Sequence, residues 1–328
     1  MPHAPLTADR IANTGPIAML GHMLLASSGS LAAPASISLP SERAFPESLS
    51  STQDGTLYVG SLAEGGVVRI KPNGAPEVWI KSGTFGSASI LGVLADEPSN
   101  TLWVCSDDLS SAGIKVAGAK SGSAVIGFDL KTGAGKIRAE FAGKHNFCND
   151  IAVDASGAAY VTNSDAPQIL RLPAGGKQLE VWFEDASLKP APGRTGLDGI
   201  AFGLDGNLYF NRYDAADLYR IDVKNGEAGK LTKLQASRNL VLADAMRPLG
   251  PNVFLLIEGG GRLDTMTVKG DSAGISTLRD GYDTPTGVTA VAGTAWVSEG
   301  QLEYLFDPAK HSQKPHVPFR LYAVTLPR

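Results

Sequence analysis

Oxygen-bearing side chains recur at one position of a short pattern that the sequence repeats six times. An apolar strand, a turn and a second apolar strand follow this position, which is occupied in chain order by Glu47, Leu91, Asn149, Asp198, Asp244 and Thr286. Carboxylate and amide oxygens are the ligands that hard cations such as Ca²⁺ and Mg²⁺ prefer. Three carboxylates in a narrow space would repel one another strongly without a cation. We therefore predict a site for one divalent metal ion, built from Glu47, Asn149, Asp198 and Asp244.

The repeat also indicates the fold. Each copy carries an aromatic residue in its second strand, and the six are Tyr58, Trp103, Tyr160, Tyr209, Phe254 and Trp296. They recur every 42 to 57 residues, which is the period of propeller blades. Equivalent positions of propeller blades face one central channel. We predict an all-β fold, a six-bladed β-propeller with four-stranded blades around a central channel. The alternative to a metal site is a polar lining of that channel, with acidic residues capping backbone groups.

The six units begin near residues 44, 88, 146, 195, 241 and 284. Residues 34–328 are accordingly predicted to form a single propeller domain. In most units a weaker outer hairpin follows, with turns such as 72–74 and 131–133 that suit positive φ angles. Residues 35–42 are expected to add an edge strand to the last unit and so close the ring.

Residues 1–33 differ from the rest of the chain. An apolar stretch follows Arg10, and Ser30-Leu31-Ala32 near its end has the small-x-small form of a cleavage site, which predicts a signal peptide and export to the periplasm or the medium. Gly21 and His22 interrupt this stretch, and a cytoplasmic protein with a disordered tail is the alternative. The stretch is too short and too interrupted for a stable membrane anchor.

Composition argues against a nucleic-acid partner, and it leaves the state of the two cysteines open. The chain has 29 basic and 33 acidic residues and no basic run, so a nucleic-acid partner is not expected. Cys105 and Cys148 are the only cysteines and fall in neighbouring units. Two separate buried thiols are favoured over a disulfide, although an exported protein would permit the bond. We expect a monomer or a small homo-oligomer.

Four short motifs contain the oxygen donors: Phe45-Pro46-Glu47, Asn149-Asp150-Ile151, Asp198-Gly199-Ile200 and Asp244-Ala245-Met246. In order and spacing they resemble the motifs of the family of gluconolactonase, regucalcin and the luciferin-regenerating enzyme. The resemblance covers about residues 44–306. Three positions depart from the family: Asp198 stands where an asparagine is usual, Ala245 stands where a glycine is usual, and Phe147 stands where the sugar-lactone enzymes often have an arginine.

The resemblance implies a six-bladed propeller that holds one divalent ion and hydrolyses a lactone or a related ester. Ca²⁺ is the favoured ion, with Mg²⁺, Mn²⁺ or Zn²⁺ as alternatives. The resemblance assigns two catalytic residues: Asp244 as the base that activates water, and Asn149, which orients the substrate or the water. Glu47 and Asp198 would mainly hold the ion. The alternative is a propeller that binds a ligand or a partner and keeps the ion for structure.

Residues near the strand ends are expected to form a pocket for a small-molecule lactone or ester. The candidates are Phe147, His145, Arg194, Asn211, Tyr213, Glu258 and Glu299. Phe147 in place of an arginine predicts a substrate less hydrophilic than an aldonolactone. Arg194 and Arg247 are alternative sources of positive charge, unless they form surface ion pairs. The sequence from Gly270 to Gly274 fits a G-x-S-x-G pattern, but it reads as a hairpin tip and predicts no serine nucleophile.

Overall fold

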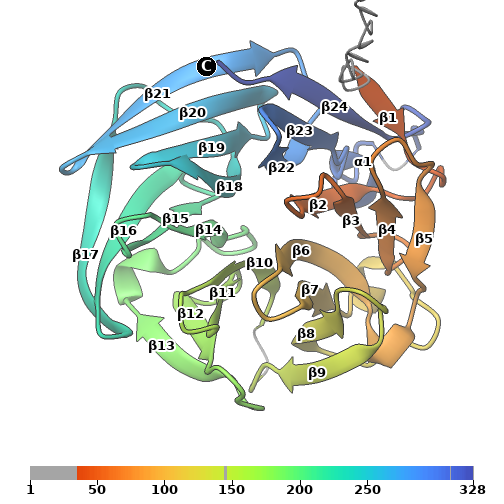
Figure 1. Cartoon of the computed structure of the whole chain (residues 1–328), viewed down its shortest axis with the longest axis horizontal. Helices are drawn as coiled ribbons and strands as arrows, with labels where there is room; N and C mark the ends of the chain where they lie inside the picture. Colours follow the sequence, from red (N-terminus) through yellow and green to blue (C-terminus); the bar gives the residue numbers. More distant parts are fainter. Residues whose placement is uncertain (1–34, 144–145, 311, 328) are drawn as a thin grey trace, which may run out of the picture. The chain divides into compact units, whose positions relative to one another are not determined.

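The computed structural model describes residues 35–143, 146–310 and 312–327, and these residues are almost entirely strands and turns (Figure 1). The all-β class predicted from the sequence is confirmed. The described residues form one compact unit. The helical segments in the described part are short: α1 (Glu303–Phe306) and the 3-10 turns Thr84–Gly86, Ser110–Ala112 and Ala186–Leu188. None of them is long and apolar enough to span a membrane.

Four sheets have four strands each. The first contains β2 (Pro46–Ser51), β3 (Leu57–Ser61), β4 (Val67–Ile70) and β5 (Glu77–Ile80). The second contains β6 (Ser89–Asp96), β7 (Thr101–Asp107), β8 (Ser123–Asp129) and β9 (Gly135–Glu140). The third contains β10 (Cys148–Val153), β11 (Ala159–Asn163), β12 (Gln168–Leu172) and β13 (Glu180–Glu184). The last contains β22 (Pro285–Val291), β23 (Thr294–Glu299), β24 (Arg320–Thr325) and β1 (Ser36–Ser38).

The remaining sheet has eight strands. Its first half is β14 (Leu197–Phe202), β15 (Leu208–Arg212), β16 (Asp217–Lys224) and β17 (Glu227–Ala236). Its second half is β18 (Ala243–Gly250), β19 (Val253–Glu258), β20 (Arg262–Lys269) and β21 (Ser272–Asp280). Each half is antiparallel, and a short parallel pairing of β17 with β21 joins them. Each half therefore repeats the pattern of the four-stranded sheets.

The innermost strands of these units form a closed ring. Strands β2, β6, β10, β14, β18 and β22 each contact the next one, and β22 contacts β2 (Figure 1). At the outer edge of the last sheet, β1 pairs antiparallel with β24 from Ser36–Tyr322 to Ser38–Arg320. The expected edge strand on the last unit is thereby confirmed.

The repeat aromatics lie in the core between neighbouring sheets. All six are buried on the second strand of their units. Tyr160 packs against Trp182 of its own sheet and against Phe202 of the next, with ring centroids 4.9 and 5.0 Å apart. Tyr209 and Phe254 join the two halves of the eight-stranded sheet at 4.7 Å. Since each large apolar side chain contributes about 1.5–3 kcal/mol when buried, this packing holds the units together and leaves the ring centre to polar residues.

Every innermost strand has a bulge near its start. In β2 the register with β3 shifts between Pro46 and Leu49, and the other five innermost strands shift at the equivalent place. Bulges re-aim side chains and are frequent beside active sites. Gly199 shows how tightly these bulges pack, because a Cβ at this position would lie 2.3 Å from the carbonyl oxygen of Asp244. The repeat position lies inside the bulge, which directs its side chain to the ring centre.

Cys105 of β7 and Cys148 of β10 form a disulfide bond, with Cα atoms 5.2 Å apart. The prediction of two separate thiols is therefore wrong. Contact between β7 and β10 brings the two residues together across neighbouring sheets, and no pattern in the sequence specifies that distance. A bond across 43 residues restricts the unfolded chain and stabilises the fold by about 2–4 kcal/mol.

Candidate metal and substrate site

The four oxygen donors meet at the centre of the ring, at the starts of β2, β10, β14 and β18. Each is at most 6% exposed. They line one narrow space together with Ser48, Asp150, Ala245 and Thr286. The repeat position of the sequence thus becomes one cluster of side chains in the structure. Leu91, the apolar member of that position, lies in the wall of an adjoining cavity.

Negative charge is unfavourable in this cluster. Burial raises the pKa of Glu47 well above its usual value, and the nearby Asp198 and Asp150 carboxylates raise it further. The pKa of Asp244 is raised first by burial and then by Asp198 and Glu47. Burial and then Asp150 raise the pKa of Asp198. Buried carboxylates that repel one another are stabilised either by protons or by a cation.

The donor set fits a hard divalent cation in its chemistry. Glu47 Oε2 is buried without a hydrogen-bond partner among the described residues. Asn149 Nδ2 donates to Asp198 Oδ2 at 3.1 Å, and the backbone N–H of Ala245 donates to Asp244 Oδ1 at 2.8 Å. Within the described residues, no three His, Cys, Asp or Glu side chains form a group that would hold a metal ion. The types of donor atom and their burial therefore suit a divalent cation, but the side chains are not arranged as a complete coordination sphere.

A buried ion pair lies beside the cluster. Arg247 Nη1 and Nη2 donate to the two carboxylate oxygens of Asp150 at 2.6 and 2.9 Å. Arg247 Nη2 also donates to the Val93 carbonyl oxygen at 3.3 Å and to Ser48 Oγ at 3.4 Å. One guanidinium thus links β18 to β10, β6 and β2. Its positive charge offsets part of the rise in the pKa of Glu47 that burial and the nearby carboxylates cause. Arg247 is 6% exposed. Its ion pair is therefore buried, and is not the surface ion pair that the sequence analysis considered.

A cavity of about 520 Å³ adjoins the ring, and the four oxygen donors form part of its wall. The rest of the wall is half apolar, with side chains from Leu62, Leu91, Phe147, Leu242, Leu302 and Phe306. Arg194, Tyr213 and Glu303 add polar groups. Part of this wall comes from the short α1 segment between β23 and β24. Polar groups converging in a partly apolar hollow are typical of sites for small molecules.

Solved structures share this arrangement of sheets. A gluconolactonase from Xanthomonas campestris is 16% identical, with a TM-score of 0.62 over 86% of each chain. Regucalcin from Agrobacterium tumefaciens, a calcium-binding protein, is 17% identical, with a TM-score of 0.60 over 88% of this chain and 95% of that one. The chain has the gluconolactonase–regucalcin fold. The resemblance inferred from the motifs is thereby confirmed at the level of the fold.

The gluconolactonase–regucalcin fold does not by itself define an activity. Virginiamycin B lyase from Staphylococcus aureus also shares it, at 15% identity and a TM-score of 0.58 over 88% of this chain and 83% of that one. No protein-family model and no curated protein matches the sequence. One fold thus carries a lactonase, a calcium-binding protein and a lyase, so function has to be argued from the site.

The predicted pocket residues divide into three groups. Phe147, Arg194 and Tyr213 line the cavity beside the ring. His145 lies outside the described residues. Asn211, Glu258 and Glu299 are not among the residues that line this cavity.

These three residues hold the backbone near the ring instead. Asn211 Nδ2 donates to the carbonyl oxygen of Asp244 at 2.5 Å. Glu258 and Glu299 accept backbone N–H groups from the segments before β18 and β22, at 2.5 and 2.9 Å. The sequence places such residues at strand ends, but the direction of each side chain depends on the neighbouring strand.

From the sequence, Asp150 was assigned no role, and Arg247 was considered only as a possible source of positive charge. Asp150 directly follows the predicted ligand Asn149, and Arg247 lies three residues after Asp244. Their closeness in the sequence to the repeat position was the one signal that could have indicated a role for them. The sequence does not show that they form an ion pair, because the pair joins residues of different sheets across the ring centre.

Asp107, at the end of β7, is expected to make stability depend on pH. Its Oδ1 accepts hydrogen bonds from Ser123 Oγ and from the backbone N–H of Cys148, while Oδ2 is buried without a partner among the described residues. Burial raises its pKa from the usual 3.8 to about 8, although both hydrogen bonds lower it. At a pH between these two pKa values, the Asp107 carboxyl keeps its proton in the folded protein and loses it in the unfolded chain.

Stability from this group is therefore complete at low pH and is lost as the pH rises toward 8. Its slope is at most about 1.4 kcal/mol per pH unit. We expect Asp107→Asn to reduce the decline in the free energy of unfolding between about pH 5 and pH 7, as measured by urea denaturation. Equal slopes for the variant and the wild type would contradict this prediction.

Proposed function

We propose that the protein is a metal-dependent hydrolase that opens a lactone or a related ester in the cavity beside the ring. The observation that carries the proposal is a cavity of about 520 Å³ with three buried carboxylates and one amide in its wall. A purely structural ion would need the same oxygens but no adjoining space for a ligand. The lactonase among the structures of the same fold agrees with this proposal.

We also propose that the fold is a six-bladed propeller. The eight-stranded sheet would then count as two blades, β14–β17 and β18–β21, joined at their outer strands. The closed ring of six innermost strands supports this count. Each blade would then contribute one residue of the repeat position to the centre, so the four donors would come from four different blades.

In the proposed site, one divalent ion, with Ca²⁺ favoured, is bound by Glu47, Asn149, Asp198 and Asp244. When bound, such an ion would polarise the substrate carbonyl and keep the neighbouring carboxylates ionised. Glu47 and Asp198 mainly serve as ligands. Asn149, which already contacts Asp198, orients the substrate or the water.

Asp244 is the proposed general base. Its carboxylate accepts a proton from water as the water oxygen attacks the carbonyl carbon. The bond between that carbon and the lactone ring oxygen then breaks, and Asp244 returns the proton to the leaving oxygen. Hydrogen bonds from Ala245 to its carboxylate and from Asn211 to its carbonyl oxygen fix its position.

The wall of the cavity suggests the substrate class. Phe147, Leu62 and Leu302 provide an apolar surface, which suits a lactone with an aliphatic or aromatic substituent. Arg194 is an exposed cation at the same cavity and is placed to attract the carboxylate that ring opening produces. We therefore propose a substrate less hydrophilic than a sugar lactone.

The proposed location of the protein is the periplasm or the medium. Residues 1–33 are proposed to be a signal peptide that is removed to leave the propeller domain, 34–328. The Cys105–Cys148 disulfide supports export, because such bonds persist mainly in oxidising compartments.

Proton release from sugar, aliphatic and aromatic lactones tests the function. We expect hydrolysis to be fastest with the substituted apolar lactones, to disappear after treatment with a chelator and to return with Ca²⁺. Circular dichroism of the stripped protein checks that the fold is kept. Folded, Ca²⁺-loaded protein that hydrolyses no lactone or ester would reject the proposal and favour a ligand-binding propeller with a structural ion.

A further inference from the structure

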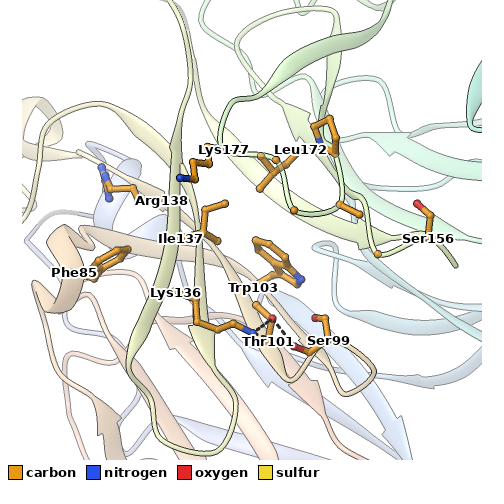
Figure 2. A pocket seen from close by; sticks show the side chains of 15 residues that line it. Phe85, Ser99, Thr101, Trp103, Lys136, Ile137, Arg138, Ser156, Leu172 and Lys177 are labelled. Atoms are coloured by element: carbon orange, nitrogen blue, oxygen red, sulfur yellow. Dashed lines mark hydrogen bonds between the residues drawn. The ribbon is translucent and has the colours of Figure 1, made fainter.

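A second cavity, of about 650 Å³, lies between the second and third sheets. Its lining includes Ser156 and Gly157 in the turn after β10. Asn149 is at the other end of β10, so the length of a strand separates this cavity from the ring site. Figure 2 shows Trp103 near its middle, with Ile137 beside it and the basic residues Lys136, Arg138 and Lys177 on one side.

A buried donor at this cavity lacks an acceptor. Trp103 is 7% exposed, and its Nε1 has no hydrogen-bond partner among the described residues. Arg138 takes no part, because its side chain lies on the opposite face of the sheet from Trp103 and Ile137. Since a buried donor without an acceptor costs about 1–3 kcal/mol, an acceptor from a ligand would stabilise Trp103.

The charged side chains that line the cavity are all positive. Its lining contains three basic side chains and no carboxylate. Among the described residues, Lys136 Nζ donates to neutral acceptors, the carbonyl oxygens of Ser99 and Asn100 and the hydroxyl of Thr101, at 2.7 to 3.1 Å. Lys177 is exposed and makes no hydrogen bond or ion pair with the described residues. An anion would therefore be attracted to this place.

The cavity also has an aromatic edge held by a strained backbone. Phe85 has φ 56° and ψ 24°, a conformation that costs a residue other than glycine about 1–3 kcal/mol. Its side chain is nevertheless 46% exposed. Gly135 makes room for its ring, because a Cβ there would lie 2.3 Å from Phe85 Cγ. Strain that keeps an aromatic ring exposed at a cavity is typical of a binding site.

We propose that this cavity is a second ligand site, which binds a small organic anion with a flat, apolar body. The body lies against Trp103, Ile137 and Leu172, and the anionic group accepts a hydrogen bond from Trp103 Nε1. Lys177 contributes attraction from the edge. Because the ring residues take no part, binding here is independent of the metal.

Binding of 2-naphthoate, measured by isothermal titration calorimetry, tests the proposal, with the neutral 2-naphthamide as the matched compound. We expect 2-naphthoate to bind, and to bind more weakly as salt is added. The amide should bind at least about tenfold more weakly, as expected when a charge-assisted hydrogen bond is lost. Treatment with a chelator should leave the affinity for 2-naphthoate unchanged.

Three variants locate the ligand. Lys177→Gln, at an exposed turn, should weaken 2-naphthoate binding about five- to tenfold, as should Trp103→Phe, which removes the donor and keeps an aromatic ring. Arg194→Gln, at the ring cavity, should leave the affinity unchanged. The proposal is overturned if no binding with a Kd below about 1 mM is found, if the amide binds equally well, or if Arg194→Gln weakens binding and Lys177→Gln does not.

Discussion

Replacing Asp244 with asparagine is expected to lower kcat for lactone hydrolysis by about a hundred- to ten-thousandfold, the range for loss of a general base. An asparagine side chain keeps the shape of Asp244 and the acceptor for the Ala245 N–H, but it cannot accept a proton from water. The same change removes one of three buried carboxylates whose pKa values are raised by burial and mutual repulsion. We therefore expect the metal-free variant to be at least as stable as the metal-free wild type.

Two measurements on this variant separate catalysis from folding. The lactone assay gives kcat, and urea denaturation in chelator gives the free energy of unfolding. Asp271→Asn, an exposed carboxylate in the turn between β20 and β21, is the control and should keep full activity. A variant of Asp244 that retains kcat would remove Asp244 as the base, and one that unfolds in chelator would indicate a structural role.

Arg247→Met is expected to destabilise the protein by about 3–5 kcal/mol, because it leaves Asp150 buried without its partner. Both charged side chains are almost completely buried, at 7% and 5% exposure. The guanidinium also bonds to groups on β2 and β6, so its loss removes links between several innermost strands. Methionine is close to arginine in length and is apolar, which limits the effect to charge and hydrogen bonding.

The double variant Asp150→Asn/Arg247→Met distinguishes an unpaired charge from lost packing. It should recover a large part of the lost stability, since a neutral asparagine leaves no uncompensated charge. Lys233→Met breaks the exposed pair with Asp217 and should change stability by at most about 1 kcal/mol. Urea denaturation measures all three. If the single and double variants were equally unstable, packing rather than charge would explain the effect.

The sequence predicts the centre of this protein better than its periphery, and the reason is the repeat. One position, repeated six times, brings Glu47, Asn149, Asp198 and Asp244 into one space because the units are arranged radially. The bulges that turn these side chains inward leave no separate trace in the sequence. They become visible only when the register of the paired strands is known.

Contacts between different units account for what the sequence did not predict. The Asp150–Arg247 pair and the Cys105–Cys148 bond each join residues of separate sheets, and periodicity gives no distance between such residues. The same limit applies to Glu258, which lies at the end of a second strand as expected. Its side chain binds Arg238 at 2.7 Å and a backbone N–H group instead of facing the cavity.

The pairing of β1 with β24 has a consequence for how the chain is made. Ser36 and Tyr322 are partners in this pairing, and at about 5–20 residues per second a ribosome needs roughly tens of seconds to synthesise the segment between them. During that time the last sheet lacks its inner strands, and β22 is not yet present to contact β2. The nascent chain therefore carries open strand edges, which can pair with other chains, until almost all of the described sequence has been translated. We expect a chaperone to be most useful to this protein during that interval.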